Sequence, residues 1–281
     1  MLHEIYLDAI RNHEVKIASI STNLNKKILE KARSIWREYE PRAKEGVVVG
    51  VDSSYNSRPF QGFHVYAVDA ICVQVDGSVI SVRQENKAGV IGQGQLEAKS
   101  MQMEIEVAAE ATDISDLVLI DGSIIARFVM GIGSVIKSVT DLTDNNQNIV
   151  FVAKTSDSRE IFEGMNSRVG DIYYFNRISN KAGYSRPYYI TRYEEKYARR
   201  ITIVFTRLSE YTPIIKLEFA GEVDEDYIKR TIDQIAFKSV AGYPYVLKIA
   251  HNTAVITDDD IQRLVSIYGL KNEIGAREVL M

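Results

Sequence analysis

One stretch near residue 50 restricts the fold more than any other, because it joins a run of valines to a carboxylate. Residues 47–51 read Val-Val-Val-Gly-Val and are followed by Asp52, Ser53 and Ser54. Valine packs well on a pleated surface, so the run predicts a buried strand with Asp52 at or near its carboxyl end. Open α/β sheets bind ligands at the carboxyl ends of their strands, which makes Asp52 a candidate metal ligand. The alternative is that Asp52 only caps a turn with the two serines.

A second stretch repeats this pattern. Residues 117–120 form the apolar run Leu-Val-Leu-Ile, which ends on Asp121, Gly122 and Ser123. An Asp-Gly pair taken alone is typical of a turn. Two buried strands that both end on an aspartate and a small residue favour a shared site over two unrelated turns.

The segment between these two strands carries a third carboxylate. Residues from about 95 to 112 have the apolar spacing of a helix, and Glu104 lies among its apolar residues. A glutamate in that setting is either at the edge of the apolar stripe or turned into a site. Glu106 and Glu110 lie on the same helix and remain alternatives to Glu104.

The composition is that of an ordinary globular protein, with 46% hydrophobic and 26% charged residues in a chain of 281. No apolar run is long enough to span a bilayer, and the acidic N-terminus is not a signal peptide, so we expect a cytoplasmic protein. The single cysteine, Cys72, excludes an internal disulfide and a cysteine-based zinc site. The formal net charge of −4 means that any contact with nucleic acid must come from a local patch.

The order of the predicted elements indicates the fold. A loop at 55–62 follows the first strand, residues 63–75 alternate as a strand, and Asp76-Gly77 is a hairpin signal before a short return strand at 79–82. The helix and the second Asp-tipped strand come next, and then a third apolar strand at 149–153. This order predicts an α/β fold with an RNase H-like mixed sheet and flanking helices.

We expect a single domain over residues 1–281, because no repeat, low-complexity tract or long linker interrupts the chain. Its predicted parts are N-terminal helices (1–45), the RNase H-like core (46–170), tyrosine-rich and basic strands with a hairpin (171–222), and C-terminal helices that carry Tyr243 and His251 (223–281). The first helix covers 2–20, and Asn23 is expected to cap the second. The polar tail from Asn272 is either an arm exchanged across a dimer or a frayed end.

Two basic regions are candidates for DNA contact. Lys154 follows the strand at 149–153, where its point charge suits a phosphate, although a solvated surface lysine is an equal alternative. Residues 171–200 hold seven Lys or Arg residues against three acids, interleaved with tyrosines. This pattern fits single-strand binding by stacking and phosphate neutralisation, but tyrosine is also common on solvent-facing strands. The predicted DNA-binding residues are Lys154, Tyr188, Arg192, Arg199 and Arg200.

The carboxylates Asp52, Glu104 and Asp121 would form an all-oxygen site if they converge, which suits Mn²⁺ or Mg²⁺. Such a cluster repels itself unless cations hold it together. Two ions about 3.5–4 Å apart can activate water and stabilise the leaving oxygen of a phosphodiester. His251 is a candidate fourth ligand or proton donor, and Tyr243 is a candidate for orienting phosphate or water.

These motifs together resemble the NurA nuclease family. The resemblance rests on Gly50–Ser54, the helix with Met103-Glu104, Ile120–Ser123, and the closing Tyr243-Pro244-Tyr245 and Ala250-His251. It implies an RNase H-like fold and a manganese-dependent nuclease that acts on single-stranded and double-stranded DNA ends. It further implies a ring-like homodimer that docks on a HerA-type hexameric ATPase. The family's catalytic residues carry over to Asp52, Glu104, Asp121, Tyr243 and His251, and its strand-end basic position to Lys154.

Three functions are therefore open. The first is a metal-dependent endonuclease and exonuclease that resects DNA ends in double-strand break repair or recombination. The second is a non-catalytic subunit on the same fold that binds DNA ends or the translocase. The third is a nuclease for Holliday junctions or RNA/DNA hybrids with the same site.

Overall fold

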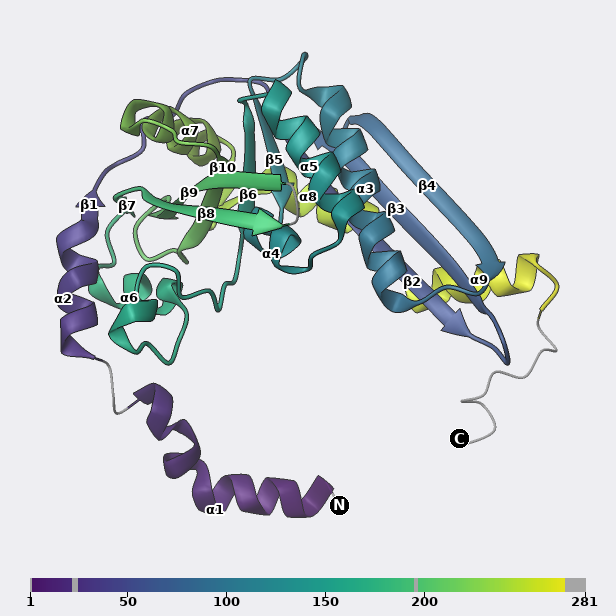
Figure 1. Cartoon of the computed structure of the whole chain (residues 1–281), viewed down its shortest axis with the longest axis horizontal. Helices are drawn as coiled ribbons and strands as arrows, with labels where there is room; N and C mark the ends of the chain where they lie inside the picture. The colour runs from purple at the N-terminus through teal and green to yellow at the C-terminus, as the bar shows by residue number, and fades with distance from the viewer. Residues whose placement is uncertain (1, 22–24, 195–196, 271–281) are drawn as a thin grey trace.

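A mixed β-sheet forms the centre of the computed structural model, which describes residues 2–21, 25–194 and 197–270 (Figure 1). Its strands follow the order β1-β7-β9-β10-β6-β5-β2-β3-β4, and β8 pairs with β9 at the side of this path. The strands are β1 (Trp36–Glu38), β2 (Val48–Pro59), β3 (His64–Gln74), β4 (Val79–Gly89), β5 (Leu117–Asp121), β6 (Ile149–Ala153), β7 (Gly183–Ser185), β8 (Tyr188–Glu194), β9 (Tyr197–Arg207) and β10 (Ile215–Ala220). A separate small hairpin pairs β11 (Ser239–Val240) with β12 (Tyr243–Pro244).

The middle of the sheet is parallel and its flanks are antiparallel. β5 pairs in parallel with both β2 and β6. From β2 the chain continues into β3 and β4 as an antiparallel meander, while β10 lies antiparallel to β6 on the other side. The predicted order of strand, meander, helix and second strand is confirmed, and so is the α/β class with a mixed sheet. Because β10 pairs with β6, the predicted parts 46–170 and 171–222 share one sheet.

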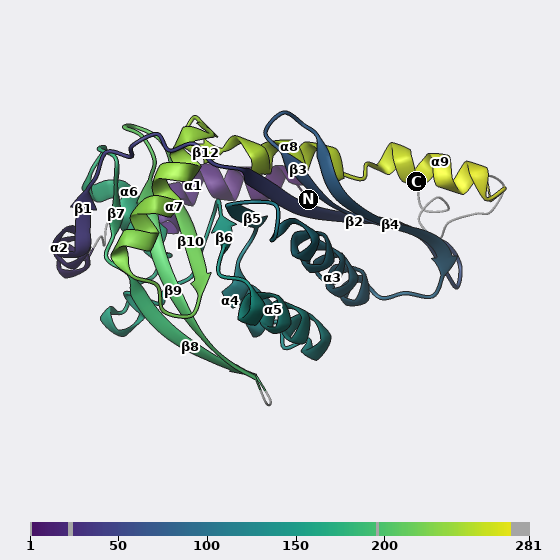
Figure 2. The same cartoon turned by 90° about the horizontal axis from the view of Figure 1, so that it is seen from above.

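Helices cover both faces of this sheet (Figure 2). α3, α4 and α5 lie on one side, and α7 and α8 lie on the other. The helices are α1 (Leu2–Ser21), α2 (Lys26–Ile35), α3 (Gln93–Ala111), α4 (Ile124–Val129), α5 (Gly133–Asn145), α6 (Asp171–Ile178), α7 (Glu225–Phe237), α8 (Tyr245–Ala254) and α9 (Asp258–Ile267), with a short 3₁₀ turn at Glu163–Met165.

Alternation along the parallel strands explains why both faces need a cover. On β5, Val118 and Ile120 face the core beneath α3 and α5, whereas Leu117 and Leu119 face the core beneath α7 and α8. All four side chains are buried. A strand buried on both faces reads as a continuous apolar run rather than as an alternating one, which is the pattern that made the strand recognisable in the sequence.

β2 is longer than the sequence predicts, and this corrects the position of Asp52. Residues 55–59, expected in a loop, continue the strand to Pro59, and β4 likewise runs on to Gly89 instead of ending near Val82. The pairing of β2 with β5 ends at Val51, whereas its pairing with β3 continues to Pro59. Asp52 therefore lies in mid-strand, at the point where the neighbouring β5 ends. Polar residues in this extension hide the strand from a hydrophobicity pattern, because ladder hydrogen bonds require no apolar side chains.

The N-terminal helix is present as predicted but packs differently from the rest. Ile5, Ile10 and Val15 of α1 are exposed, and the helix projects away from the sheet (Figure 1). Asn25 caps α2 by accepting a hydrogen bond from the backbone N–H of Lys27. The predicted cap at Asn23 and the predicted arm from Asn272 lie outside the described residues. No helix in the described ranges is both long enough and apolar enough to cross a membrane.

Candidate metal centre

Three side chains from separate parts of the chain converge at the end of β5. Asp52 comes from β2, Asp121 from the last residue of β5, and His251 from α8. One ligand atom from each residue lies within 4.8 Å of the ligand atoms of the other two. The parallel pairing of β2 with β5 brings the two aspartates to the same edge of the sheet, as the sequence predicts.

The close approach of α8 to β2 determines where His251 lies. Gly50 is directly below this helix, and a Cβ atom built at Gly50 would lie 2.7 Å from the carbonyl carbon and oxygen of Val246. Only glycine leaves the space that the helix backbone occupies. The first turn of α8 therefore packs closely against β2. His251, which lies little more than one turn after Val246, is thereby placed next to Asp52.

His251 and Asp52 form a direct polar contact. Nδ1 of His251 lies 2.8 Å from Oδ2 of Asp52, and the backbone N–H of Ser53 donates to Oδ1 of the same carboxylate at 2.8 Å. The imidazole is about half exposed, whereas the aspartate is buried. A carboxylate at Nδ1 fixes the ring orientation and leaves Nε2 directed away from Asp52, where it can meet a ligand or a water.

Asp121 has two further partners that the sequence singled out. Nζ of Lys154 lies 2.7 Å from its Oδ2 atom. The hydroxyl of Tyr243 is 3.4 Å from its Oδ1 atom. Lys154 also stands over the Tyr243 ring, 5.1 Å from the ring centroid, so the ammonium, the phenol and the carboxylate form one group.

Glu104 lines the same cavity as the two aspartates but makes a different contact. This cavity has a volume of about 540 Å³, and Arg127 of α4 also lines it. The guanidinium of Arg127 donates to the Glu104 carboxylate and, at 3.4 Å, to the backbone carbonyl of Asp121. Glu104 is therefore near the Asp52–Asp121–His251 group, in an ion pair rather than in direct contact with it.

The other two acids of α3 point elsewhere. Glu110 accepts from Ser81 at 2.5 Å and pairs with Arg83, and Glu106 lies 3.8 Å from Arg83. Both partners belong to β4, at the outer edge of the meander. Of the three glutamates that the sequence left open, Glu104 is the one that lines the cavity with Asp52 and Asp121.

Burial and crowding make the cluster unfavourable for negative charge. Burial raises the pKa of Glu104 to about 7 although the Arg127 guanidinium lowers it, and the negative charges of Asp52 and Asp121 contribute to this increase. Burial and the neighbouring Asp121 also raise the pKa of Asp52, against the hydrogen bond from His251. A divalent cation would reverse both effects, because it stabilises the charged carboxylates.

This donor set fits a hard divalent cation. Carboxylate oxygens and an imidazole nitrogen suit Mn²⁺ and Mg²⁺ better than soft metals, and the only cysteine, Cys72, is buried. Asp52, Asp121 and His251 could hold such an ion directly. Glu104 lines the same cavity but is not in the group whose ligand atoms lie within 4.8 Å of one another, so it would join them by moving toward the ion.

Arg127 is the residue of this site that sequence reasoning missed. It lies in the helix Ile-Ile-Ala-Arg-Phe-Val, in which a single arginine would be predicted to face the solvent. In the fold it is 3% exposed, and its Nε and Nη1 atoms have no hydrogen-bond partner among the described residues. Its cation lies 5.3 Å from the centroid of the Phe151 ring. The sequence contains one hint of its role: Arg127 lies four residues, about one helical turn, after Ser123 and so follows the Asp121-Gly122-Ser123 motif closely.

The predicted DNA-binding residues of β8 and β9 lie on an outer hairpin, and their charges are partly balanced. Arg192 pairs with Glu160 at 3.1 Å, Arg199 with Asp144 at 2.6 Å, and Arg200 with Glu222 at 2.5 Å. Tyr188 is 37% exposed at the start of β8. The acids come from outside residues 171–200, so the local excess of basic residues overstated the positive charge of this surface.

The chain is similar to known proteins over most of its length. The family model described as "NurA domain" matches residues 46–256. The DNA double-strand break repair nucleases NurA of Saccharolobus solfataricus and Sulfurisphaera tokodaii are 23% and 20% identical, and each alignment covers 96% or more of both chains.

Solved structures share this fold over nearly the whole chain. The crystal structure of the NurA nuclease from Sulfolobus solfataricus has a TM-score of 0.81 at 21% identity and covers 96% of this chain and 97% of its own. A crystal structure of NurA with manganese has a TM-score of 0.74 at 10% identity and covers 96% of this chain and 100% of its own.

Proposed function

The chain belongs to the NurA family, and from this premise we propose that it is a divalent-metal-dependent nuclease that hydrolyses DNA phosphodiesters in double-strand break repair. The convergence of Asp52, Asp121 and His251 within 4.8 Å carries the proposal. Two carboxylates and an imidazole at one sheet edge, beside a lysine, fit the binding of a cation together with a phosphate. The names of the relatives, which are repair nucleases, support DNA as the substrate.

The metal ligands in this proposal are Asp52, Asp121, His251 and, after a movement toward the ion, Glu104. When bound, Mn²⁺ or Mg²⁺ would activate water and offset the charge that develops on the phosphodiester. Two ions could stabilise both the attacking and the leaving oxygen. The manganese-containing NurA structure is consistent with such an ion. The elevated pKa of Glu104 and of Asp52 supports the same site, because strongly perturbed pKa values cluster at functional sites.

The remaining side chains are proposed to act on the substrate. Lys154 would release Asp121 and neutralise a non-bridging phosphate oxygen as a point charge. The Tyr243 hydroxyl, which already reaches Asp121, would orient the phosphate. His251 has no such role on the substrate, because Asp52 occupies its Nδ1 atom and Nε2 is the atom that would bind the metal.

The proposed partners extend beyond the single chain. Single-stranded DNA and DNA ends are the proposed substrates, with Tyr188, Arg192, Arg199 and Arg200 as outer contacts. A homodimer is supported by the exposed apolar side chains of α1, such as Ile5 and Val15, which another chain could cover. The family resemblance adds a HerA-type hexameric ATPase as the proposed translocase partner. A DNA substrate also supports a cytoplasmic location.

A single substitution tests the proposed activity. Labelled single-stranded DNA is incubated with the wild type, Asp52→Asn and the control Asp69→Asn in Mn²⁺, Mg²⁺ or EDTA. Asp69 is a half-buried acid of the neighbouring strand β3, outside the metal centre. We expect metal-dependent products from the wild type and the control and at least a 100-fold loss in Asp52→Asn. Binding without products in every metal would instead favour the non-catalytic subunit.

A further inference from the structure

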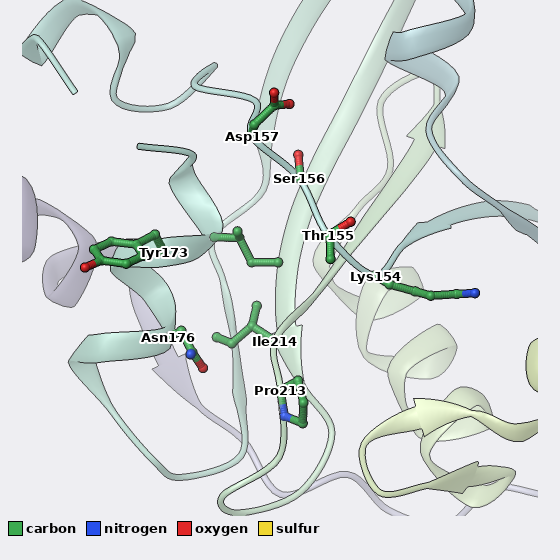
Figure 3. A pocket seen from close by; sticks show the side chains of 9 residues that line it. Lys154, Thr155, Ser156, Asp157, Tyr173, Asn176, Pro213 and Ile214 are labelled. Carbon is green, nitrogen blue, oxygen red and sulfur yellow. The ribbon is translucent and has the colours of Figure 1, made fainter. Parts of the chain in front are cut away.

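A second cavity, of about 560 Å³, adjoins the metal centre (Figure 3). It lies between the segment 154–157 that follows β6, helix α6, and Pro213 and Ile214 before β10. Its volume is within the range of about 300–1,000 Å³ that is usual for sites of small ligands. None of the functions proposed above uses it.

Lys154 connects this cavity to the metal centre. Lys154 is one of the residues that line the cavity, and its Nζ atom lies 2.7 Å from the Asp121 carboxylate. Figure 3 shows the Lys154 side chain pointing away from the cavity, with Tyr173 at the opposite side and Ile214 between them. A group in the cavity and a phosphate at the metal centre would therefore lie at opposite ends of the same Lys154 side chain.

The lining suits a flat and uncharged group. Ile172, Ile214 and Pro213 supply apolar walls, and the carboxylate of Asp157 at the rim disfavours a second phosphate. Ile214 is buried, so this wall is held by the core and does not depend on a mobile loop. Apolar walls with a few polar groups at the edge match a nucleobase, whose faces are apolar and whose edge is polar.

The polar edge of the cavity has a fixed orientation at Asn176. Its Oδ1 atom accepts a hydrogen bond from Nη2 of Arg207 at 3.0 Å. A guanidinium can only donate, so the amide nitrogen of Asn176 is the atom left to donate to a ligand. Each of the four bases carries a hydrogen-bond acceptor on its edge, and a single donor therefore tolerates all of them.

A cation lies against Tyr173, one of the residues that line the cavity. The guanidinium of Arg177 lies over the Tyr173 ring, 3.8 Å from the ring centroid, and Arg177 itself is exposed. Because Tyr173 and Lys154 lie on opposite sides of the cavity, their two cations, Arg177 and Lys154, lie toward opposite sides as well. Phosphates on either side of a single nucleotide would meet positive charge at both positions.

We propose that this cavity binds one unstacked nucleobase of the DNA strand, next to the phosphodiester held at the metal centre. The proposal rests on the proposed nuclease function and specifies its substrate. A base that is paired and stacked in a duplex cannot enter a walled cavity, so the strand must be single or frayed at this nucleotide. Cleavage would be tolerant of base identity but dependent on the presence of a base.

An abasic scan tests the proposal. Single-stranded oligonucleotides that lack the base at one position in turn are cleaved by the wild type in Mn²⁺. We expect one position relative to the cut to lower the rate about tenfold, as the loss of one base contact does in single-strand binders. Equal rates for every abasic position would overturn the proposal. Absence of metal-dependent cleavage of the intact strand would instead overturn the nuclease function, so the two failures are distinguishable.

Two variants locate the effect in the cavity. Thr155→Trp fills the space from an exposed rim position, and Tyr173→Ala removes one side of it. We expect both to cleave the intact strand about tenfold more slowly and to lose little more when the base is absent. Ser134→Trp, at an exposed site on α5, should respond to the abasic scan as the wild type does. If Thr155→Trp and Tyr173→Ala also respond as the wild type does, the base binds elsewhere.

Binding provides a readout that does not depend on catalysis or on one variant. Fluorescence anisotropy of the same oligonucleotides with the metal-free proteins gives the dissociation constants. The intact strand should bind the wild type more tightly than the critical abasic strand, and this difference should vanish in Tyr173→Ala. A difference that survives in both cavity variants would contradict the proposal.

Discussion

The guanidinium of Arg127 donates to the carboxylate of Glu104 inside the fold, where both side chains are at most 4% exposed. The same guanidinium reaches the backbone carbonyl of Asp121 and lies against the Phe151 ring. Arg127 therefore balances the charge of one acid of the metal centre and holds that acid close to the end of β5. A cation that drew Glu104 toward Asp52 and Asp121 would compete with this pair.

Breaking the pair from one side should destabilise the metal-free protein. We expect Arg127→Met to lower the free energy of unfolding by about 3 kcal/mol, because it leaves the Glu104 carboxylate buried without its partner. Adding Glu104→Gln to this variant should restore most of the loss, since a neutral amide tolerates burial better. Urea unfolding in the presence of EDTA measures both variants. A double variant as unstable as Arg127→Met would show that the pair is not the cause.

Gly50 should be intolerant of even the smallest side chain. A methyl group there would overlap the backbone of Val246, so Gly50→Ala should displace α8 and with it the contact between His251 and Asp52. We expect a loss of about 2 kcal/mol in stability from overpacking and a larger relative loss of nuclease activity. Gly89→Ala is the matched control, because nothing lies within 4 Å of its added Cβ. Equal effects of the two substitutions in thermal unfolding and cleavage assays would contradict this explanation.

The core of the fold could be predicted because its parallel strands are buried on both faces. The runs at 47–51, 117–120 and 149–153 are apolar at nearly every position, and each is a strand of the observed sheet. The extension of β2 from Ser53 to Pro59 could not be predicted in this way. It is stabilised by pairing with β3, and backbone pairing leaves no trace in a hydrophobicity pattern.

The residues of the metal centre also fall into those that the sequence could predict and those that it could not. Asp52 and Asp121 were recognisable because each follows an apolar run, and the parallel register then brings them together. Arg127 was not recognisable, because its burial depends on α3, which is distant in sequence and supplies Glu104. Lys216 and Glu218 illustrate the same limit: they alternate with apolar residues on β10, yet they form a fully buried ion pair of 2.7 Å. The alternation places Lys216 and Glu218 on one face of β10, but it cannot reveal that another part of the chain buries this face.

Metal binding should depend on pH with a definite sign. Burial raises the pKa of Glu104 from its ordinary 4.5 to about 7, so protons compete with the metal below neutrality. We expect a fixed Mn²⁺ concentration to raise Tm more at about pH 8 than at about pH 6.

In the metal-free protein, Glu104 should make stability fall, rather than rise, as the pH increases. Its raised pKa contributes stability that is fully present below its ordinary pKa and is lost as the pH rises through about 7. Glu104→Gln should reduce the pH dependence of Tm in the metal-free protein and the pH dependence of the rise in Tm with Mn²⁺, both measured by scanning calorimetry. A metal-induced change in Tm that is equal at the two pH values would contradict the assignment of Glu104 as a ligand.

Lys154 should act on the phosphate more than on the fold. Its ammonium is partly exposed, so its ion pair with Asp121 contributes little to stability, and Lys154→Met should leave Tm nearly unchanged. We expect the same variant to lower kcat/KM about 100-fold, the usual effect of removing one preorganised group that meets developing charge. Lys181→Met removes a comparable exposed partner of Glu38 on the far edge of the sheet and should cleave normally. The activity of Lys154→Met should also respond less steeply to added salt, because one phosphate contact is missing. Wild-type activity in Lys154→Met would show that its charge serves only Asp121.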